Sequence, residues 1–236
     1  VMLSNGQALL NDQGRAVTDS NDEKEIAGLL RVLPFAGTDT VFKSLRIGVG
    51  ASIGEVDGTS AAGFDLISTE LSVMYLNSTA GTFDGARSRV TPQFSWAAGP
   101  FSLRGEYLHR RDEFVSGSAQ SALVSTGWYG AATVILTGED KKVEDRIVPA
   151  STWGAVELAL RYATLKIDDL AGSGIAPVAG NAESVKALTF GVNWWVTRNV
   201  RFTADVIHEK YSDDIIFDND NTDALTGFLF RAQVDF

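Results

Sequence analysis

The chain has 236 residues, of which 44% are hydrophobic and 21% charged, and it contains no cysteine. This composition excludes a disordered chain and a disulfide scaffold, and the formal net charge of −10 argues against a protein that binds nucleic acid through its phosphates. The apolar runs are shorter than the roughly 18 residues of a membrane-spanning helix, which excludes a helical membrane protein but not a transmembrane β-barrel.

Apolar and polar residues alternate along the chain in segments of about ten residues, and this period of two predicts β-strands. In 44–53, for example, Ile47 and Val49 alternate with Arg46 and Gly48. The predicted strands, in chain order, span 25–33, 44–53, 86–97, 101–111, 127–137, 153–167, 184–197, 200–211 and 228–236. We therefore predict nine antiparallel strands, each with one apolar and one polar face.

The connections between the predicted strands differ in length. Short turns are expected at 98–100 and 197–199, and long polar loops at 54–83, 112–125, 168–183 and 212–222. The link at 138–152 is the exception, because it is long on the side of the short turns. Short periplasmic turns and long extracellular loops are typical of outer-membrane barrels.

Several stretches of the chain carry a family resemblance in a fixed order. They are 24–35 with 45–54, 84–106, 127–139, 153–167, 188–199 and 225–236. The most specific motifs are GPF at 99–101, LTGE at 136–139 and GVNWW at 191–195. Together these stretches resemble the phosphate-selective porin O and P family, and the resemblance covers most of the chain.

The resemblance implies an all-β, transmembrane antiparallel β-barrel of the outer-membrane porin type, with about nine strands present of sixteen. It implies a homotrimer or a larger envelope assembly, surrounded by outer-membrane lipid in the bacterial cell. Because nine strands cannot return both ends of the barrel to the periplasm, we expect 1–236 to be the C-terminal part of one barrel domain. Residues 1–24 would form a loop, and the N-terminal strands would lie outside this chain. The terminal aromatic Phe236 would be the membrane-insertion signal.

Arginines occupy the polar faces of the predicted strands more often than acids do. A guanidinium group stays protonated and presents forked donors that match phosphate oxygens. A row of such groups therefore lowers the energy barrier for an anion that leaves water and enters the lumen. The candidates for an anion path are Arg46, Arg87, Arg89, Arg104, Arg161, Arg201 and Arg231. Arg87 and Arg89, separated only by Ser88, are the strongest. The alternative is that these arginines pair with inward acids and tie neighbouring strands together.

These observations predict passive diffusion of small inorganic anions, of phosphate type by the resemblance, through an Arg-lined lumen, with no enzyme activity, cofactor or metal. The stretch 218–221 alternates Asp and Asn, but it lacks the central Gly and distal Glu of a calcium loop. The alternative is a porin-like structural or interaction barrel of the envelope. Its acidic loops, with Asp213, Asp214 and Asp218 in one of them, would then bind cations or a partner.

Overall fold

The computed structural model describes residues 1–4, 24–56, 64–68, 70–78, 81–116, 119–143, 146–168 and 180–235. Within these ranges all regular secondary structure is β-strand. The strands are β1 (Met2–Ser4), β2 (Glu25–Val32), β3 (Arg46–Val56), β4 (Phe64–Ile67), β5 (Met74–Ser78), β6 (Thr82–Ala98), β7 (Phe101–Ser116), β8 (Ala119–Ile135), β9 (Ala155–Asp168), β10 (Ser184–Trp195), β11 (Val200–Phe217) and β12 (Asp220–Val234). The described part of the chain holds no helix that is both long and apolar enough to cross a membrane.

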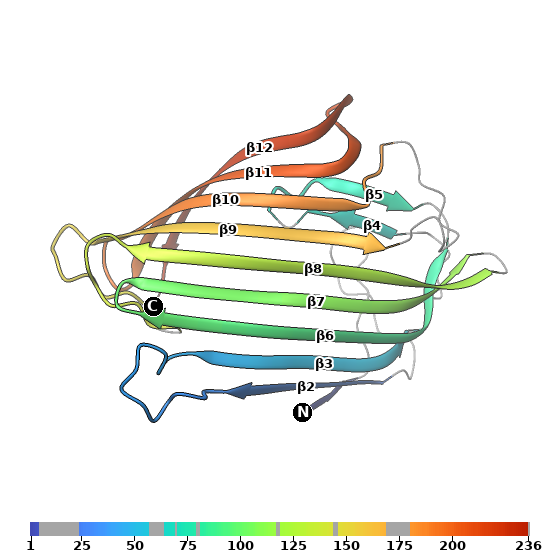
Figure 1. Ribbon diagram of the computed structural model, residues 1–236. Coiled ribbons are helices and arrows are strands. Elements are labelled where there is room, and N and C mark those ends of the chain that lie inside the picture. Colours follow the sequence, from blue (N-terminus) through green and yellow to red (C-terminus); the bar gives the residue numbers. More distant parts are fainter. Residues whose placement is uncertain are drawn as a thin grey trace.

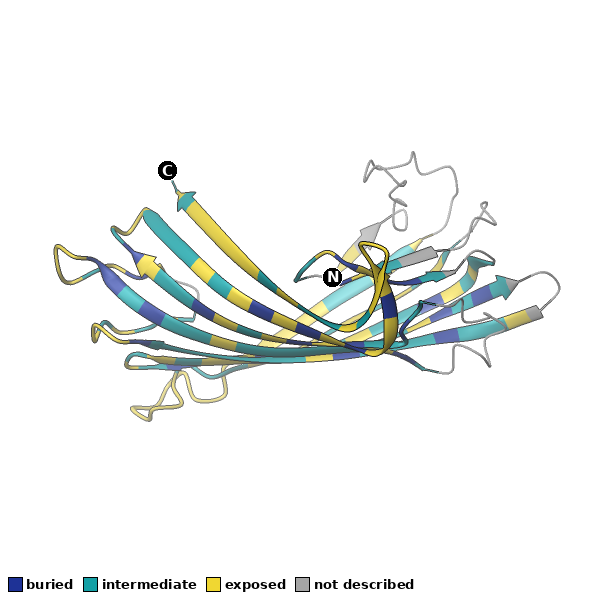
Figure 2. Cartoon of the chain, turned by 90° about the horizontal axis from the view of Figure 1, so that it is seen from above, coloured by how far each residue is buried: buried dark blue, intermediate teal, exposed yellow. Residues whose placement is uncertain are grey.

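Ten of the strands form one sheet, in the order β1-β2-β3-β6-β7-β8-β9-β10-β11-β12, and β4 and β5 pair separately as a hairpin. Every neighbouring pair is antiparallel. The large sheet curls into an open trough (Figure 1, Figure 2). The strands are therefore arranged as a meander, which is the arrangement of a barrel wall.

The nine predicted strands are confirmed as β2, β3 and β6 to β12. Two expected loops were wrong in part. The loop at 1–24 contains β1, which pairs with residues Glu25 to Ala27 and covers part of the free edge of β2. The loop at 54–83 contains β4 and β5. β1 has three residues, β4 four and β5 five. Strands this short are too short for a pattern of alternation to be recognised in the sequence.

Two other expected loops, 112–125 and 212–222, are continuations of strands. β7 runs to Ser116 and β8 starts at Ala119, and β11 runs to Phe217 and β12 starts at Asp220. Asp218 and Asn219 join the last two with φ values of 52° and 68°, as in a two-residue type I′ hairpin turn. Alternation fades in these extensions because polar and apolar residues occur on both faces, as in Phe114-Val115 and Ile215-Ile216-Phe217, while the backbone pairing continues.

Exposure alternates along the strands of the sheet (Figure 2). On β3 the side chains of Ile47, Val49 and Ile53 are exposed, whereas Arg46 and Ser52 between them are half-buried. We call the face with the exposed apolar residues the outer face and the opposite one the inner face. An apolar outer face on a curved antiparallel sheet is the arrangement of a membrane barrel, so the predicted fold class is confirmed.

The buried apolar residues lie where other segments pack against the inner face. The larger cluster joins Val73, Tyr75 and Leu76 of the β4–β5 hairpin to residues such as Phe114 and Tyr211 of the wall. A smaller cluster joins Ile147, from the link between β8 and β9, to Ile135, Ala155 and Trp195. Two segments that connect strands therefore fold back over the trough.

Candidate functional site

The register of the sheet places all seven candidate arginines on the inner face. Arg46 lies opposite Ser95, which lies opposite Arg104, and the same row continues through Ala131 to Arg161. Arg87 and Arg89 precede Ser95 by eight and six residues along β6, so they point to the same face. Arg201 and Arg231 point the same way on β11 and β12, opposite Gln233 and Thr203.

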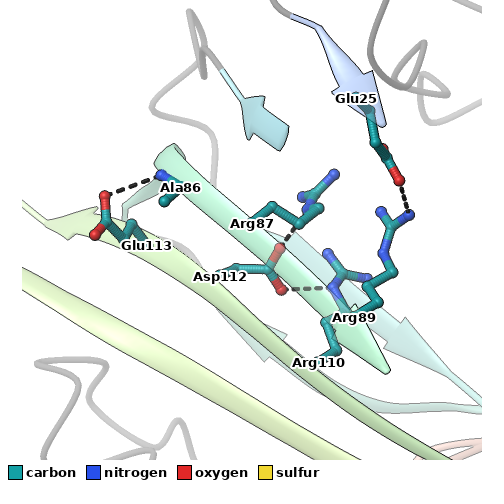
Figure 3. A network of polar contacts seen from close by, with 7 residues as sticks. All are labelled: Glu25, Ala86, Arg87, Arg89, Arg110, Asp112 and Glu113. Carbon is teal, nitrogen blue, oxygen red and sulfur yellow. Dashed lines mark hydrogen bonds and ion pairs between the residues drawn. The ribbon is translucent and has the colours of Figure 1, made fainter. Parts of the chain in front are cut away.

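Arg87 and Arg89, the strongest candidates from the sequence, each contact an acid (Figure 3). Arg87 is only 4% exposed, and its Nε donates to Asp112, which is 2% exposed. Asp112 also accepts a hydrogen bond from Nε of Arg110 at 2.5 Å. Nη1 of Arg89 lies 2.9 Å from Oε1 of Glu25. Arg87 is therefore paired with an acid of the neighbouring strand β7, and Arg89 is paired with an acid of β2.

Arg161 connects the wall to the β4–β5 hairpin. Its guanidinium group forms an ion pair with Glu70 and lies over the ring of Tyr129, 4.9 Å from the centroid. The cation is thus shared between a carboxylate of the hairpin and an aromatic face of β8, an arrangement that lowers the cost of burying part of the side chain.

The remaining candidates are Arg201, Arg104, Arg231 and Arg46, which differ in exposure. Nη2 of Arg201 donates to Oε1 of Gln233 at 2.7 Å, and its guanidinium group lies 4.7 Å from the centroid of Trp195. Arg104 and Arg231 are exposed, and Arg46 is half-buried. Arg46 and Arg104 face Ser95 from its two sides, so their backbones are two strand spacings, about 10 Å, apart.

The β4–β5 hairpin is fixed to the inner face by polar contacts as well as by its apolar residues. The backbone amide of Leu71 donates to Oε1 of Glu209 at 3.2 Å, and the hydroxyl of Tyr211 donates to Oε2 of the same carboxylate at 2.5 Å. Glu209 is fully buried. Burial, followed by the charge of Glu209, raises the pKa of the Tyr75 phenol above its ordinary value.

A cavity of about 270 Å³ lies between the hairpin and the wall. Its lining includes Glu70, Glu106, Tyr129, Arg161 and Glu209. This cavity therefore contains carboxylates beside its arginine. The sequence reasoning missed the hairpin, although the apolar run VMYL at 73–76 inside an otherwise polar stretch was a usable signal.

The link between β8 and β9 also enters the trough, at the end opposite the hairpin. Nζ of Lys141 donates to Oε1 of Glu157 at 2.5 Å, Asn193 donates to Oε2 of the same group at 3.2 Å, and Thr203 donates to Asn193 at 2.7 Å. Glu157 is 2% exposed. A lysine from a connecting segment therefore neutralises an acid buried in the wall, a contact that the sequence pattern did not predict.

Outside the strands, the link contains a carboxylate with a shifted pKa. Slight burial of the Glu139 carboxylate acts to raise its pKa. Hydrogen bonds from the amide of Ala150 and the hydroxyl of Thr137 outweigh this effect and lower the pKa overall. The Ala150 bond measures 3.0 Å. The charged form of Glu139 therefore helps to fold the link back on itself.

Two other predictions from the sequence concern the stretch 218–221 and the terminal residue Phe236. Residues 218–221 form the tip of the β11–β12 hairpin rather than a loop that wraps an ion, and the described residues contain no group of three or more His, Cys, Asp or Glu able to hold a metal. Phe236, the predicted membrane-insertion signal, lies outside the described residues.

The chain is similar in sequence to a known porin and in structure to an outer-membrane protein. Porin O of Pseudomonas aeruginosa is 30% identical over 151 residues, which are 60% of this chain and 34% of that protein, so the match spans about a third of the relative's length. Two structures of OmpT, an outer-membrane protein of Vibrio cholerae, cover 89% of this chain and 56% of theirs, with TM-scores of 0.46 (in-vitro folded) and 0.49 (outer-membrane expressed) and identities of 13% and 12%. The family model for phosphate-selective porin O and P matches residues 7–236. The chain therefore belongs to the phosphate-selective porin O and P family, whose place is the bacterial outer membrane.

Proposed function

We propose that this porin chain forms part of the wall of a channel through which small inorganic anions, of phosphate type, diffuse passively. The charge of the inner face of β2, β3, β6 and β7 carries the proposal. The described inner-face residues of these strands include six arginines, Arg31, Arg46, Arg87, Arg89, Arg104 and Arg110, against three acids, Glu25, Glu106 and Asp112. This wall is therefore positive although the whole chain is negative.

The inner face of β8 to β12 shows no such surplus of arginines. Its described residues include Arg161, Arg201 and Arg231 together with the acids Glu157, Asp205 and Glu209. An anion would therefore find its lowest electrostatic energy beside β2 to β7. The proposed path gives most weight to Arg104, which is exposed, and to Arg46, which lies in the same row on the other side of Ser95. Arg201 and Arg231 are secondary candidates.

The spacing of Arg46 and Arg104 supports transient contact with a permeating anion. About 10 Å between backbones is close to one Debye length, about 8 Å at physiological salt. Flexible guanidinium side chains could both reach one ion between them and release it again, as conduction requires. No covalent step and no cofactor are needed for this function.

The open edges of the sheet support a barrel that is completed by further strands. On the described part of β2, β1 covers only residues Glu25 to Ala27, and β12 is the last strand of the sheet order. Unpaired backbone groups are costly in lipid, so we propose that upstream strands of the same protein close a barrel of about sixteen strands. Assembly as a homotrimer, within outer-membrane lipid, is part of the same proposal.

Replacing Arg46 and Arg104 together with alanine is expected to lower the anion-to-cation permeability ratio by about threefold. The reason is that two positive charges leave the positive wall while the backbone pairing remains. The measurement is the reversal potential of the full-length protein in a planar bilayer under a salt gradient. Arg198→Ala is the control, because Arg198 is exposed in the turn between β10 and β11 and should leave the ratio unchanged.

The same measurement tests the alternative of a structural barrel with acidic loops. An unchanged ratio in the Arg46 and Arg104 variant would assign the arginines to the scaffold. A large change on replacing Asp213 and Asp214 with asparagine would assign selectivity to the projecting β11–β12 hairpin instead.

Replacing residues 66–76 with a short Gly/Ser bridge is expected to raise the single-channel conductance by about twofold, because the β4–β5 hairpin fills part of the trough. Single-channel recording of the reconstituted protein measures this. The control for assembly is the change in gel mobility that a folded barrel shows between unheated and heated samples. Unchanged conductance in a correctly assembled variant would place the hairpin outside the narrowest section.

A further inference from the structure

Lysine and arginine residues of the strands occur on both faces of the sheet. The inner face holds the arginines described above. The described strands carry four basic residues on the outer face, and these are Arg111, Lys166, Lys186 and Lys210. We call these four residues the outer cation row. All of them are exposed.

The row lies at one height on the outer face. On each strand, residues are counted from the outward-facing apolar residue at the opposite end, which is number one. By this count Arg111 is the eleventh residue from Phe101, Lys166 is the eleventh from Val156, and Lys210 is the eleventh from Val200. Lys186 is the ninth from Trp194. A tilted strand crosses the hydrocarbon core in about 9–11 residues, so all four cations stand at one membrane interface.

This interface is the one nearer the long extensions of the strands. Beyond the row, β7 continues to Ser116 and β11 to Phe217, whereas the opposite ends of β6 and β7 are joined by the short turn at 99–100. Long extracellular and short periplasmic connections characterise outer-membrane barrels. The row therefore faces the headgroups of the outer leaflet.

Within the row, like charges are close together. Lys186 lies directly opposite Lys210 in the register of β10 and β11, and Lys166 is a diagonal neighbour of Lys186 because it lies opposite Ser184. Like charges directly opposite each other on one face destabilise a sheet. An anion bound from outside the protein would remove that repulsion.

The neighbouring acids compensate only part of this charge. Lys166 pairs with Asp168 at 2.5 Å and Lys210 with Asp223 at 2.7 Å. Among the described residues, neither Lys186 nor Arg111 forms an ion pair. These two cations are therefore the available positions in the row.

We propose that the outer cation row is a binding site for the phosphate groups of a phosphorylated lipid headgroup in the outer leaflet, with Lys186 and Arg111 as its main contacts. The apolar residues next to the row, such as Leu188 and Phe190 on β10, would pack against the acyl chains of the same lipid. This site lies on the opposite face of the sheet from the proposed anion path and does not depend on it.

The test uses the full-length protein in a neutral detergent, titrated with diphosphorylated lipid A and followed by native mass spectrometry. The double variant Lys186→Gln with Arg111→Gln is expected to bind the lipid about thirtyfold more weakly, and Lys186→Gln alone about fivefold. Lys186→Arg should retain wild-type binding because it keeps the charge. The matched control is Lys43→Gln with Arg198→Gln, which removes the same two residue types from turns at the opposite end of the barrel and should leave the affinity within about twofold.

Four results would overturn the proposal, and the last of them is competition by inorganic phosphate. The first is equal weakening by the control pair, which would indicate a general charge effect. The second is equal binding of lipid A from which both phosphates have been removed, which would assign the affinity to the apolar face alone. The third is wild-type affinity in the Lys186 and Arg111 double variant. Inorganic phosphate at equal concentration should fail to compete, since it lacks the acyl contacts; full competition would identify a free-phosphate site instead.

Discussion

Replacing Leu160 with arginine is expected to destabilise the protein by roughly 2–4 kcal/mol, because the charge would enter the lipid near the middle of the membrane. Leu160 is 50% exposed on the outer face of β9, between Ala132 of β8 and Phe190 of β10. Urea-induced unfolding of the full-length protein in lipid vesicles measures the effect.

The neighbouring residue provides the control for this substitution. Ala159 precedes Leu160 on the same strand and points to the inner face, opposite Thr133 and Gly191. The same change to arginine there should cost at most about 1 kcal/mol, since the new guanidinium group would meet water. Equal costs at 159 and 160 would mean that the inner and outer faces are assigned the wrong way round.

Replacing Asp112 with asparagine is expected to cost about 3–5 kcal/mol of stability, because it removes the counter-charge of a buried arginine. Asp112 is 2% exposed and serves both Arg87, which is 4% exposed, and Arg110. The desolvated charge of Arg87 would lose the carboxylate of Asp112. The free energy of unfolding in vesicles is again the measurement.

Two further variants separate charge from packing at this site. Asp223→Asn breaks an exposed pair with Lys210, so it should have little effect. Replacing Asp112 with leucine and Arg87 with methionine together should recover much of the stability lost in Asp112→Asn, since neither buried charge then remains. A double variant as unstable as the single one would show that the pair contributes through more than its charges.

The sequence alone predicted much of this fold, because a barrel wall has one face in lipid and one in water. That difference imposes a period of two on every strand that crosses the membrane. It was sufficient to locate β2, β3 and β6 to β12 and to place each candidate arginine on the inner face. Where polar and apolar residues occur on both faces, as near the tip of β11 and β12, the period is lost and the strand extension was missed.

The alternation pattern also predicted which residues face inward, but it could not predict their partners. A partner depends on the register between strands that are distant in sequence, and one residue of slip moves a side chain to the other face. Asp112 meets Arg87 across 25 residues, and Glu25 meets Arg89 across 64. The relative standing of Arg87 and Arg46 in the proposed path therefore came only from the structure.

Sequence by itself thus determined the class of the protein, the strands β2, β3 and β6 to β12, and the two faces of its wall. Tertiary structure decided what fills the trough: the β4–β5 hairpin held on Glu209 through Leu71, and the link that brings Lys141 to Glu157. The physical reason is the range of the interactions. Alternation is written into adjacent residues, whereas the position of a folded-in segment is set by contacts with wall strands as far as 138 residues away.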